Sequence, residues 1–339
     1  MSNSAPVPAP RGRIGRHLVH RPHSFDPLAV DTPADRVQEF VLTGELPTGH
    51  PLFGDGPGHF HDPQAALAMV RQVSEGIGQG HFGIPADRVG VFYRFGLDIG
   101  DVGAWRRHGG PGTLAVTMRV RPDKVISGIP RALEFDTRLE IDGIPAGTGS
   151  ASLLFLAPLL HRSHREHNRA TALASAGQDT QPAGHGGAHR PLQPDTAAPA
   201  GPGAAEVGRS TPGNVLLREP LTVDGSRLSV AVRPPHTWPA VVAREDGVPA
   251  PALLLEALRQ TALLAAHRLR GLDPRHSTPA ALHTHFRGYA EPDLPLRCVA
   301  VAQDAGQDAL GRPLVPLTLT LTQAGRAVTE ATVSVVEDL

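Results

Sequence analysis

Pro251-Ala-Leu-Leu-Leu-Glu-Ala-Leu-Arg-Gln260 is the stretch that decides the fold, because a fainter copy of it lies far upstream. The copy is Asp62-Pro-Gln-Ala-Ala-Leu-Ala-Met-Val-Arg-Gln72. Both are apolar, helix-forming runs that end in Arg-Gln, follow a loop rich in Pro and Gly, and precede stretches with the pattern of β-strands. Such internal similarity predicts two related halves. It also singles out Glu256, because the first copy has Ala68 at the matching position.

The composition is that of an ordinary globular protein. Of the 339 residues, 40% are hydrophobic and 19% are charged, and the formal net charge is −1. This charge gives no electrostatic basis for binding nucleic acid or an anionic membrane. No stretch approaches the ~18 apolar residues of a membrane span, and residues 1–10 lack the pattern of a secretory signal. We therefore expect a cytoplasmic protein, and its single cysteine, Cys298, excludes an internal disulfide.

Strand-like runs accompany each of the two helical stretches. In the first half we expect a helix at about 62–80 and strands at 37–43, 91–99, 112–121, 131–141 and 147–156. In the second half we expect a helix at 251–270 and strands at 214–218, 227–233, 283–289, 296–303, 314–321 and 326–336. The second helix is apolar on nearly all sides, as expected for a helix enclosed by a curved sheet. The pattern predicts an α+β fold: a hotdog fold repeated twice and packed as an intramolecular pseudo-dimer.

Composition also suggests where the halves end. Residues 1–15 are rich in Pro, Ser and Gly, and we expect them to be disordered. Residues 163–211 lose all apolar periodicity, so we expect a disordered linker between hotdog domains at 16–162 and 212–339. The histidines at 161, 164, 167, 185 and 189 are irregularly spaced, which argues against a metal site.

Four stretches of the chain carry a resemblance to a known family. They are Glu39-Phe-Val-Leu-Thr43, His81-Phe-Gly-Ile-Pro85, Leu253-Leu-Leu-Glu-Ala-Leu-Arg-Gln260 and Phe286-Arg-Gly-Tyr-Ala-Glu-Pro-Asp-Leu-Pro295. In the order of these motifs the chain resembles the AfsA-type hotdog proteins of A-factor biosynthesis. The resemblance implies an acyltransferase that moves a 3-oxoacyl group from an acyl-carrier thioester to the hydroxyl of dihydroxyacetone phosphate. The products of this family are precursors of γ-butyrolactone-type or furan-type autoregulators.

The resemblance also implies the partners of the protein. These are an acyl carrier protein or a coenzyme A thioester as donor and a small phosphorylated acceptor, with no metal and no redox cofactor. Hotdog domains usually work in pairs, and one chain already contains such a pair. The sequence is therefore compatible with a monomer and with a homodimer. The chain departs from the family at Ala68, where the family has Glu, and at Gly247-Val248, where the family has Asp-His.

Glu256, Arg259 and Gln260 follow one another at i, i+3 and i+4, which places them on one face of the helix. Charged groups in so apolar a helix must be paired or line a cavity. An internal ion pair that fixes helix packing is one reading. The family signature favours the other, in which Glu256 is the general base that deprotonates the acceptor hydroxyl. Arg259 would then tune the pKa of Glu256 or bind the acceptor phosphate, and Gln260 would orient the substrate.

The remaining candidates are substrate-binding residues. Arg71 and Gln72 are the counterparts of Arg259 and Gln260 in the first half, and we expect them to anchor a phosphate or the pantetheine arm. His285 shares a strand face with His283, and we consider it a candidate for reaching the acyl cavity. Cys298 lies in mid-strand, where a buried structural thiol is the simpler reading.

Two other functions are compatible with these residues. A hotdog 3-hydroxyacyl-thioester dehydratase also places a carboxylate on the central helix, but it needs a histidine opposite, and Val248 stands where the family has one. A protein that has lost catalysis and only binds an acyl ligand would explain Ala68, Gly247 and Val248, whereas the intact Glu256–Gln260 motif opposes it.

Overall fold

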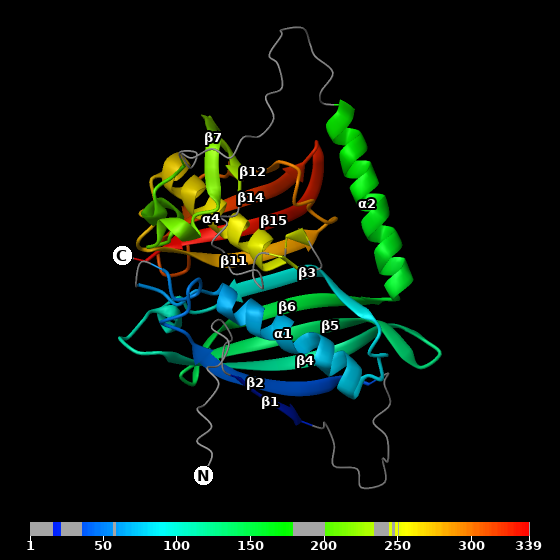
Figure 1. Cartoon of the computed structure of the whole chain (residues 1–339). Coiled ribbons are helices and arrows are strands. Elements are labelled where there is room, and N and C mark those ends of the chain that lie inside the picture. Colours follow the sequence, from blue (N-terminus) through cyan, green and yellow to red (C-terminus); the bar gives the residue numbers. More distant parts are fainter. Residues whose placement is uncertain are drawn as a thin grey trace, which may run out of the picture.

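The computed structural model describes residues 16–21, 36–56, 59–178, 201–233, 244–245, 248–249 and 251–338. The described residues form two halves, each with a long helix packed against antiparallel strands (Figure 1). In the first half, strands β1 (Arg16–Arg21), β2 (Gln38–Leu46), β3 (Val89–Ile99), β4 (Gly112–Ile126), β5 (Ile129–Ile141) and β6 (Ile144–Leu156) surround α1 (Gln64–His81). In the second half, α4 (Pro251–Arg270) is surrounded by β7 (Leu217–Asp224), β8 (Arg227–Val232), β11 (Ser277–Phe286), β12 (Leu296–Ala302), β14 (Pro313–Gln323) and β15 (Arg326–Glu337). The fold is the double hotdog predicted from the repeat.

The two halves share one continuous antiparallel sheet. Its strand order is β1-β2-β4-β5-β6-β3-β11-β15-β14-β12-β8-β7. The halves join where β3 pairs with β11, with Leu97 opposite Leu282 and Gly96 opposite His283. Because the sheet is continuous across this junction, α1 and α4 lie on the same side of it and contact each other. Two short strands, β9 (Arg244–Glu245) and β10 (Val248–Pro249), pair separately, and β13 (Gly306–Gln307) pairs with β14.

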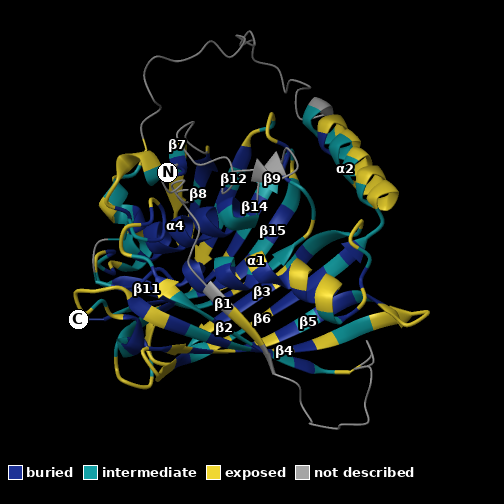
Figure 2. Cartoon of the chain, turned by 60° about the horizontal axis from the view of Figure 1, so that its bottom comes forward, coloured by how far each residue is buried: buried dark blue, intermediate teal, exposed yellow. Residues whose placement is uncertain are grey.

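The core lies between the sheet and the two helices (Figure 2). In α4 every residue from Leu253 to Ala266 is buried. In α1 the buried positions follow a helical stripe that includes Met69, Val73 and Ile77, while Gln72 and Glu75 are exposed. The first helix is therefore amphipathic, with one side packed on the sheet and the other exposed, and the second is buried over most of its length.

The expected disordered linker over 163–211 is wrong at both ends. Its beginning belongs to helix α2 (Pro158–Gln178), which stands along one side of the molecule (Figure 1). Its end contains the short helix η2 (Ala204–Val207), which packs on α4 and is followed at once by η3 (Pro212–Asn214). Residues 179–200 and the expected disordered residues 1–15 lie outside the described part. The expected strand at 214–218 begins later, at Leu217, because η3 covers residues 212–214. The separation into domains at 16–162 and 212–339 stays a prediction.

No helix within the described ranges is long and apolar enough to cross a membrane.

Candidate functional site

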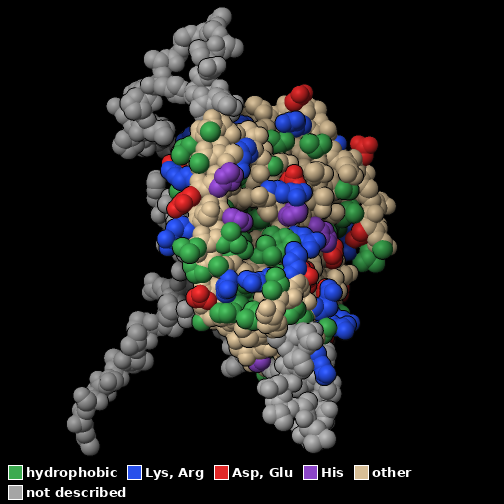
Figure 3. Space-filling view, turned by 90° about the vertical axis from the view of Figure 1, so that its right-hand side faces the viewer, with side chains coloured by type: hydrophobic (Ala, Val, Ile, Leu, Met, Phe, Trp, Pro, Cys, Tyr) green, Lys and Arg blue, Asp and Glu red, His purple; other side chains and the backbone are tan. Residues whose placement is uncertain are grey.

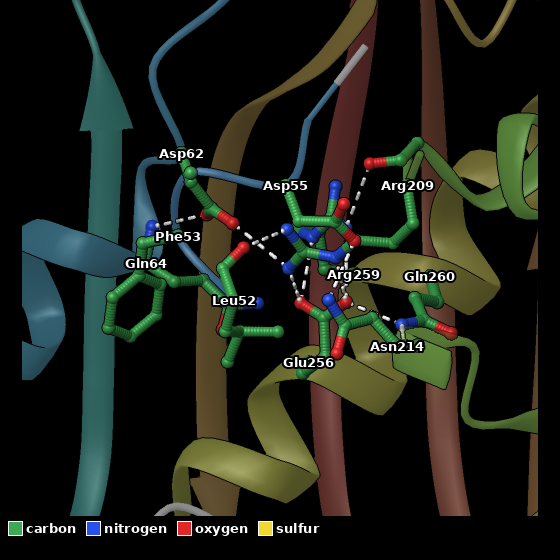
Figure 4. Close-up of polar contacts among 12 residues, drawn as sticks. Leu52, Phe53, Asp55, Asp62, Gln64, Arg209, Asn214, Glu256, Arg259 and Gln260 are labelled. Atoms are coloured by element: carbon green, nitrogen blue, oxygen red, sulfur yellow. Dashed lines mark hydrogen bonds and ion pairs between the residues drawn. The ribbon is translucent and has the colours of Figure 1, made fainter. Parts of the chain in front are cut away.

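Glu256 lies at the centre of a buried ion cluster (Figure 4). Its side chain has no exposed surface, and its two oxygens accept five hydrogen bonds. Arg209 donates from Nε (2.8 Å) and Nη2 (2.6 Å), and Arg259 from Nε (2.9 Å) and Nη2 (3.0 Å). The amide of Gln260 donates the fifth, at 2.5 Å. A carboxylate offers about four lone-pair sites, so its acceptor capacity is fully used.

Arg209 brings the first half of the chain into this cluster. Its Nη2 lies 2.9 Å from Oδ2 of Asp62, just before α1, and its Nη1 donates to the Leu52 carbonyl at 2.7 Å. The guanidinium is fully buried, and two carboxylates balance the charges of Arg209 and Arg259. The cluster is therefore electrically neutral, which is the condition for burying so many charges.

The backbone before Arg209 turns in a way that only glycine allows easily. Gly208 has φ +65°, and a Cβ on it would lie 2.7 Å from Cδ1 of Leu263 and 3.1 Å from Nη1 of Arg259. Gly208 thus permits both the left-handed turn and the close approach to α4. After Arg209 the chain is held by Asp55, whose carboxylate accepts hydrogen bonds from Thr211 and Asn214.

The electrostatics of the cluster oppose a role for Glu256 as a base in this conformation. Burial alone would raise the pKa of Glu256, but Arg209 and Arg259 together lower it to about 2. The same ion pairs overcome the effect of burial on Arg209 and raise its pKa. A carboxylate with so low a pKa is a weak proton acceptor, and its lone pairs already face donors.

Gln260 is also bound within the protein. Its Nε2 donates to the Asn214 carbonyl at 2.7 Å, and its Oε1 accepts from the Leu216 amide at 2.8 Å. Beside Arg259 lies a cavity of about 10 Å³ next to Gln64, whose Nε2 has no hydrogen-bond partner within the described residues. That volume is the size of a single water molecule.

The loop that faces α4 comes from the other half of the chain. His50 is buried, and its Nδ1 accepts hydrogen bonds from the amides of Leu52 and Phe53, at 3.1 Å each. Its Nδ1 is therefore unprotonated, and the ring fixes the loop that presents the Leu52 carbonyl to Arg209. The loop before one helix thus completes the surroundings of the other helix. Val248, which stands where the family has a histidine, lies in β10, and Gly247 lies outside the described residues.

A cavity of about 700 Å³ lies elsewhere, along the exposed side of α1. Arg71 and Gln72 line it from α1, and Pro251 and Leu254 line it from the beginning of α4. One wall is apolar, with Phe92, Leu154, Leu156 and Phe286. The lining also includes basic side chains and histidines: Arg88, His161, His164, Arg165 and Arg287. This combination suits a ligand with an apolar chain and an anionic group.

The structure thus divides the predicted site residues into two groups. Glu256, Arg259 and Gln260 come together as predicted, but in the buried cluster, whereas Arg71 and Gln72 line the cavity. His285 belongs to neither; it is half-buried, and its ring centroid lies 6.4 Å from that of Tyr93. Cys298 is buried, and burial raises the pKa of its thiol to about 12, so the thiol stays protonated.

Sequence reasoning missed Arg209 and Arg165, and it considered His161 and His164 only as metal ligands, which it rejected. All four lie in or next to the stretch taken for a disordered linker, whose composition hid them. The contacts that order this stretch are made to Asp55, Glu256 and Glu291, far away in the sequence. No local pattern reports such contacts.

Comparisons with known proteins agree with the motifs. The family model of the A-factor biosynthesis hotdog domain matches residues 193–336. A 2-oxo-3-(phosphooxy)propyl 3-oxoalkanoate synthase from Streptomyces coelicolor is 29% identical over 282 residues, which are 82% of this chain and 78% of that protein.

Solved structures with a similar course of the chain include a 12:0-ACP thioesterase from Umbellularia californica. It is 9% identical, with a TM-score of 0.47, and the match covers 96% of this chain and 94% of that one. A pyran synthase domain from module nine of the sorangicin pathway matches at 15% identity and a TM-score of 0.49, covering 89% of this chain and 94% of that one.

Proposed function

Because the chain belongs to the A-factor biosynthesis hotdog family, we propose that it transfers a 3-oxoacyl group from a thioester to the hydroxyl of dihydroxyacetone phosphate or a similar acceptor. The observation that carries the proposal is the similarity, over most of the chain, to a synthase named for such an ester. The name 2-oxo-3-(phosphooxy)propyl 3-oxoalkanoate describes dihydroxyacetone phosphate esterified with a 3-oxo acid. The reaction belongs to autoregulator or secondary-metabolite biosynthesis.

The cavity of about 700 Å³ supports this proposal as the substrate site. Its apolar wall, with Phe92 and Leu154, suits the acyl chain, and Arg71 and Arg88 suit a phosphate. The phosphate belongs either to the acceptor or to the pantetheine arm of the donor. We propose an acyl carrier protein or coenzyme A as the carrier of the donor thioester. No metal or redox cofactor takes part in this scheme.

Glu256 and Arg259 have a positioning role in this scheme. The carboxylate is sealed from the cavity and held by two guanidinium groups, so it ties α4, Arg209 and the loop before α1 into one unit. Gln260 adds the backbone of residues 214–216 to the same unit. Direct proton transfer by Glu256 would require Arg209 to leave the cluster.

The sealed carboxylate also favours a second function. If Arg209 stays in place throughout, and if no group in the cavity replaces Glu256 as base, the protein binds an acyl thioester without turning it over. This binding function is the alternative that the experiment below must separate from transfer.

The test is to incubate the purified protein with a 3-oxoacyl thioester and dihydroxyacetone phosphate and to analyse the products by mass spectrometry. We expect the phosphorylated ester or its cyclised butenolide. Thiol release without the acceptor would indicate hydrolysis instead. Tight binding of the thioester without any product would establish the binding function.

Arg71→Ala is the informative variant for this assay. Loss of a charge-assisted hydrogen bond to a phosphate costs about 1.5–3 kcal/mol, so we expect KM for the phosphorylated substrate to rise about tenfold to a hundredfold. Arg275→Ala is the matched control, because Arg275 is exposed and does not line the cavity. Equal effects of both changes would contradict the placement of the substrate. Glu256→Gln is unsuitable here, because it unbalances a buried cluster and endangers folding.

A further inference from the structure

Helix α2 forms part of the cavity, although its sequence resembles a linker. His161, His164 and Arg165 from its first two turns line the cavity together with Arg71. Figure 3 views the side of the molecule that carries α2. The outer side of α2 is exposed, with Leu159 at 76% and Leu160 at 46% (Figure 2). The helix is therefore held in place by its inner side alone.

A buried carboxylate anchors that inner side. Glu291 has no exposed surface and accepts hydrogen bonds from Arg165 (2.9 Å), Arg169 (3.0 Å) and Asn168 (3.3 Å). The amide of Asn168 also donates to the Tyr289 carbonyl at 3.0 Å. A carboxylate buried this deeply is costly unless it is paired, so the position of α2 is built into the fold.

The anchor orients His161. The Tyr289 ring lies between two residues of α2: the guanidinium of Arg165 stacks on it at 4.7 Å, and the His161 ring meets it edge-on, with centroids 5.9 Å apart. Among the histidines and carboxylates of the cavity wall, Glu75, Asp87 and His164 are exposed, whereas His161 is half-buried. His161 thus combines access to the cavity with a fixed ring orientation.

We infer that His161 is the general base of the acyl transfer, an assignment that rests on the proposed function. In this step an imidazole nitrogen of His161 takes the proton of the acceptor hydroxyl, while the hydroxyl oxygen bonds to the thioester carbonyl carbon. The carbon–sulfur bond then breaks, and the leaving thiolate takes the proton back from the imidazolium. Imidazole is suited to this exchange because it gains and loses a proton near neutral pH.

Two substitutions distinguish a catalytic role of the His161 ring from a purely structural one. His161→Phe keeps an aromatic ring against Tyr289 but has no proton acceptor, and His161→Ala opens space for added imidazole. His167→Ala is the matched control, because His167 is an exposed histidine on the same helix that does not line the cavity. Thermal unfolding of each variant shows that the fold is kept.

We would measure kcat for ester formation, together with the Kd of a non-reactive ketone analogue of the thioester. For His161→Phe we expect kcat to fall about 10²–10⁴-fold with an unchanged Kd, and for His161→Ala we expect added imidazole to restore part of the rate. His167→Ala should behave as the wild type. The assignment is overturned if His161→Phe keeps its kcat, or if His164→Ala loses it in place of His161→Phe. A wild-type protein that binds the analogue but forms no ester overturns the proposed function, and the assignment with it.

Discussion

Glu256 contributes to stability through its ionised form. Its pKa lies at about 2 in the folded protein, below the ordinary value of 4.5, so the unfolded chain binds the proton more tightly. The contribution is complete above about pH 4.5 and is lost as the pH falls towards 2. The shift corresponds to about 3 kcal/mol in the free energy of unfolding. Urea unfolding of the wild type and of Glu256→Gln at several pH values measures it.

Two results are expected from that pair of proteins. At pH 7 the variant should be less stable by about 3–5 kcal/mol, because Arg209 and Arg259 keep their charges while the carboxylate is gone. Below pH 4.5 the difference should shrink, because the wild type then loses its own contribution. A constant difference across the whole range would show that the carboxylate is not held by the two guanidinium groups.

His61 affects the stability of the fold in a higher pH range than Glu256 does. It is almost fully buried, and burial, together with the nearby Arg107, lowers its pKa to about 4. The unfolded chain, in which the pKa is near 6.5, therefore takes up the proton first, so stability should fall as the pH decreases from about 6.5 to 4. His61→Gln should flatten this part of the curve, and the exposed His167→Gln should leave it as in the wild type. Urea unfolding in this range distinguishes them.

At the scale of single residues, the sequence pattern identified Arg259 as a partner of Glu256 but did not identify Arg209. The spacing of Glu256, Arg259 and Gln260 was enough to place them on one face of α4, and the structure confirms their contact. Arg209 was out of reach, because it lies 47 residues before Glu256 in a stretch without apolar periodicity. Because Arg209 pairs with Glu256, we propose a positioning role for this carboxylate in place of the role of general base.

At the scale of elements, α2 depends on ion pairs in place of an apolar face. Glu291→Gln should therefore loosen α2 by leaving Arg165 and Arg169 without their buried counter-charge. Hydrogen–deuterium exchange should become faster over residues 158–178 while the amides of α4 keep their protection. Asp293→Asn is the graded control, because Asp293 is half exposed and its one ion pair among the described residues is with Arg169, so its effect should be small. Equal exchange in both variants would contradict the anchoring role of Glu291.

The same helix shows why sequence patterns found the two central helices and not this one. Helices α1 and α4 bury apolar stripes or whole apolar surfaces, which leave a periodic signal. In α2, Ala172 is buried but most apolar side chains are exposed, and Asn168 and the two arginines make the contacts. Polar anchoring of α2 depends on the position of the Glu291 carboxylate, which is distant in the sequence. The strand lengths and turns of the second half determine that position.

At the scale of the whole molecule, the repeat was sufficient to predict the double hotdog but not how the halves complete each other. The loop at His50–Asp55 belongs to the first half, yet it faces α4 and receives Arg209. The loop directly before α4, where the chain departs from the family at Gly247-Val248, does not supply these contacts within the described residues. In a pseudo-dimer whose helices contact each other, neighbours across the interface can be closer than neighbours in the sequence, and a one-dimensional pattern does not show this.

The repeat also leads to a prediction about stoichiometry. Arg259 and Gln260 on α4 are engaged in the sealed cluster, whereas their counterparts Arg71 and Gln72 on α1 line the cavity of about 700 Å³. The two related positions have thus diverged, because Ala68 provides no carboxylate for Arg71 at the position from which Glu256 binds Arg259. We therefore expect one acyl thioester to bind per chain.

Isothermal titration calorimetry with the non-reactive ketone analogue of the coenzyme A thioester measures this number directly. One site per chain is expected, with an affinity that Arg71→Ala weakens about tenfold or more and that Arg275→Ala leaves unchanged. Two sites of similar affinity would mean that the cluster around Glu256 opens in solution, with Arg209 withdrawn. In that case the carboxylate would become accessible to substrate, and the general base would have to be sought on α4 instead of α2.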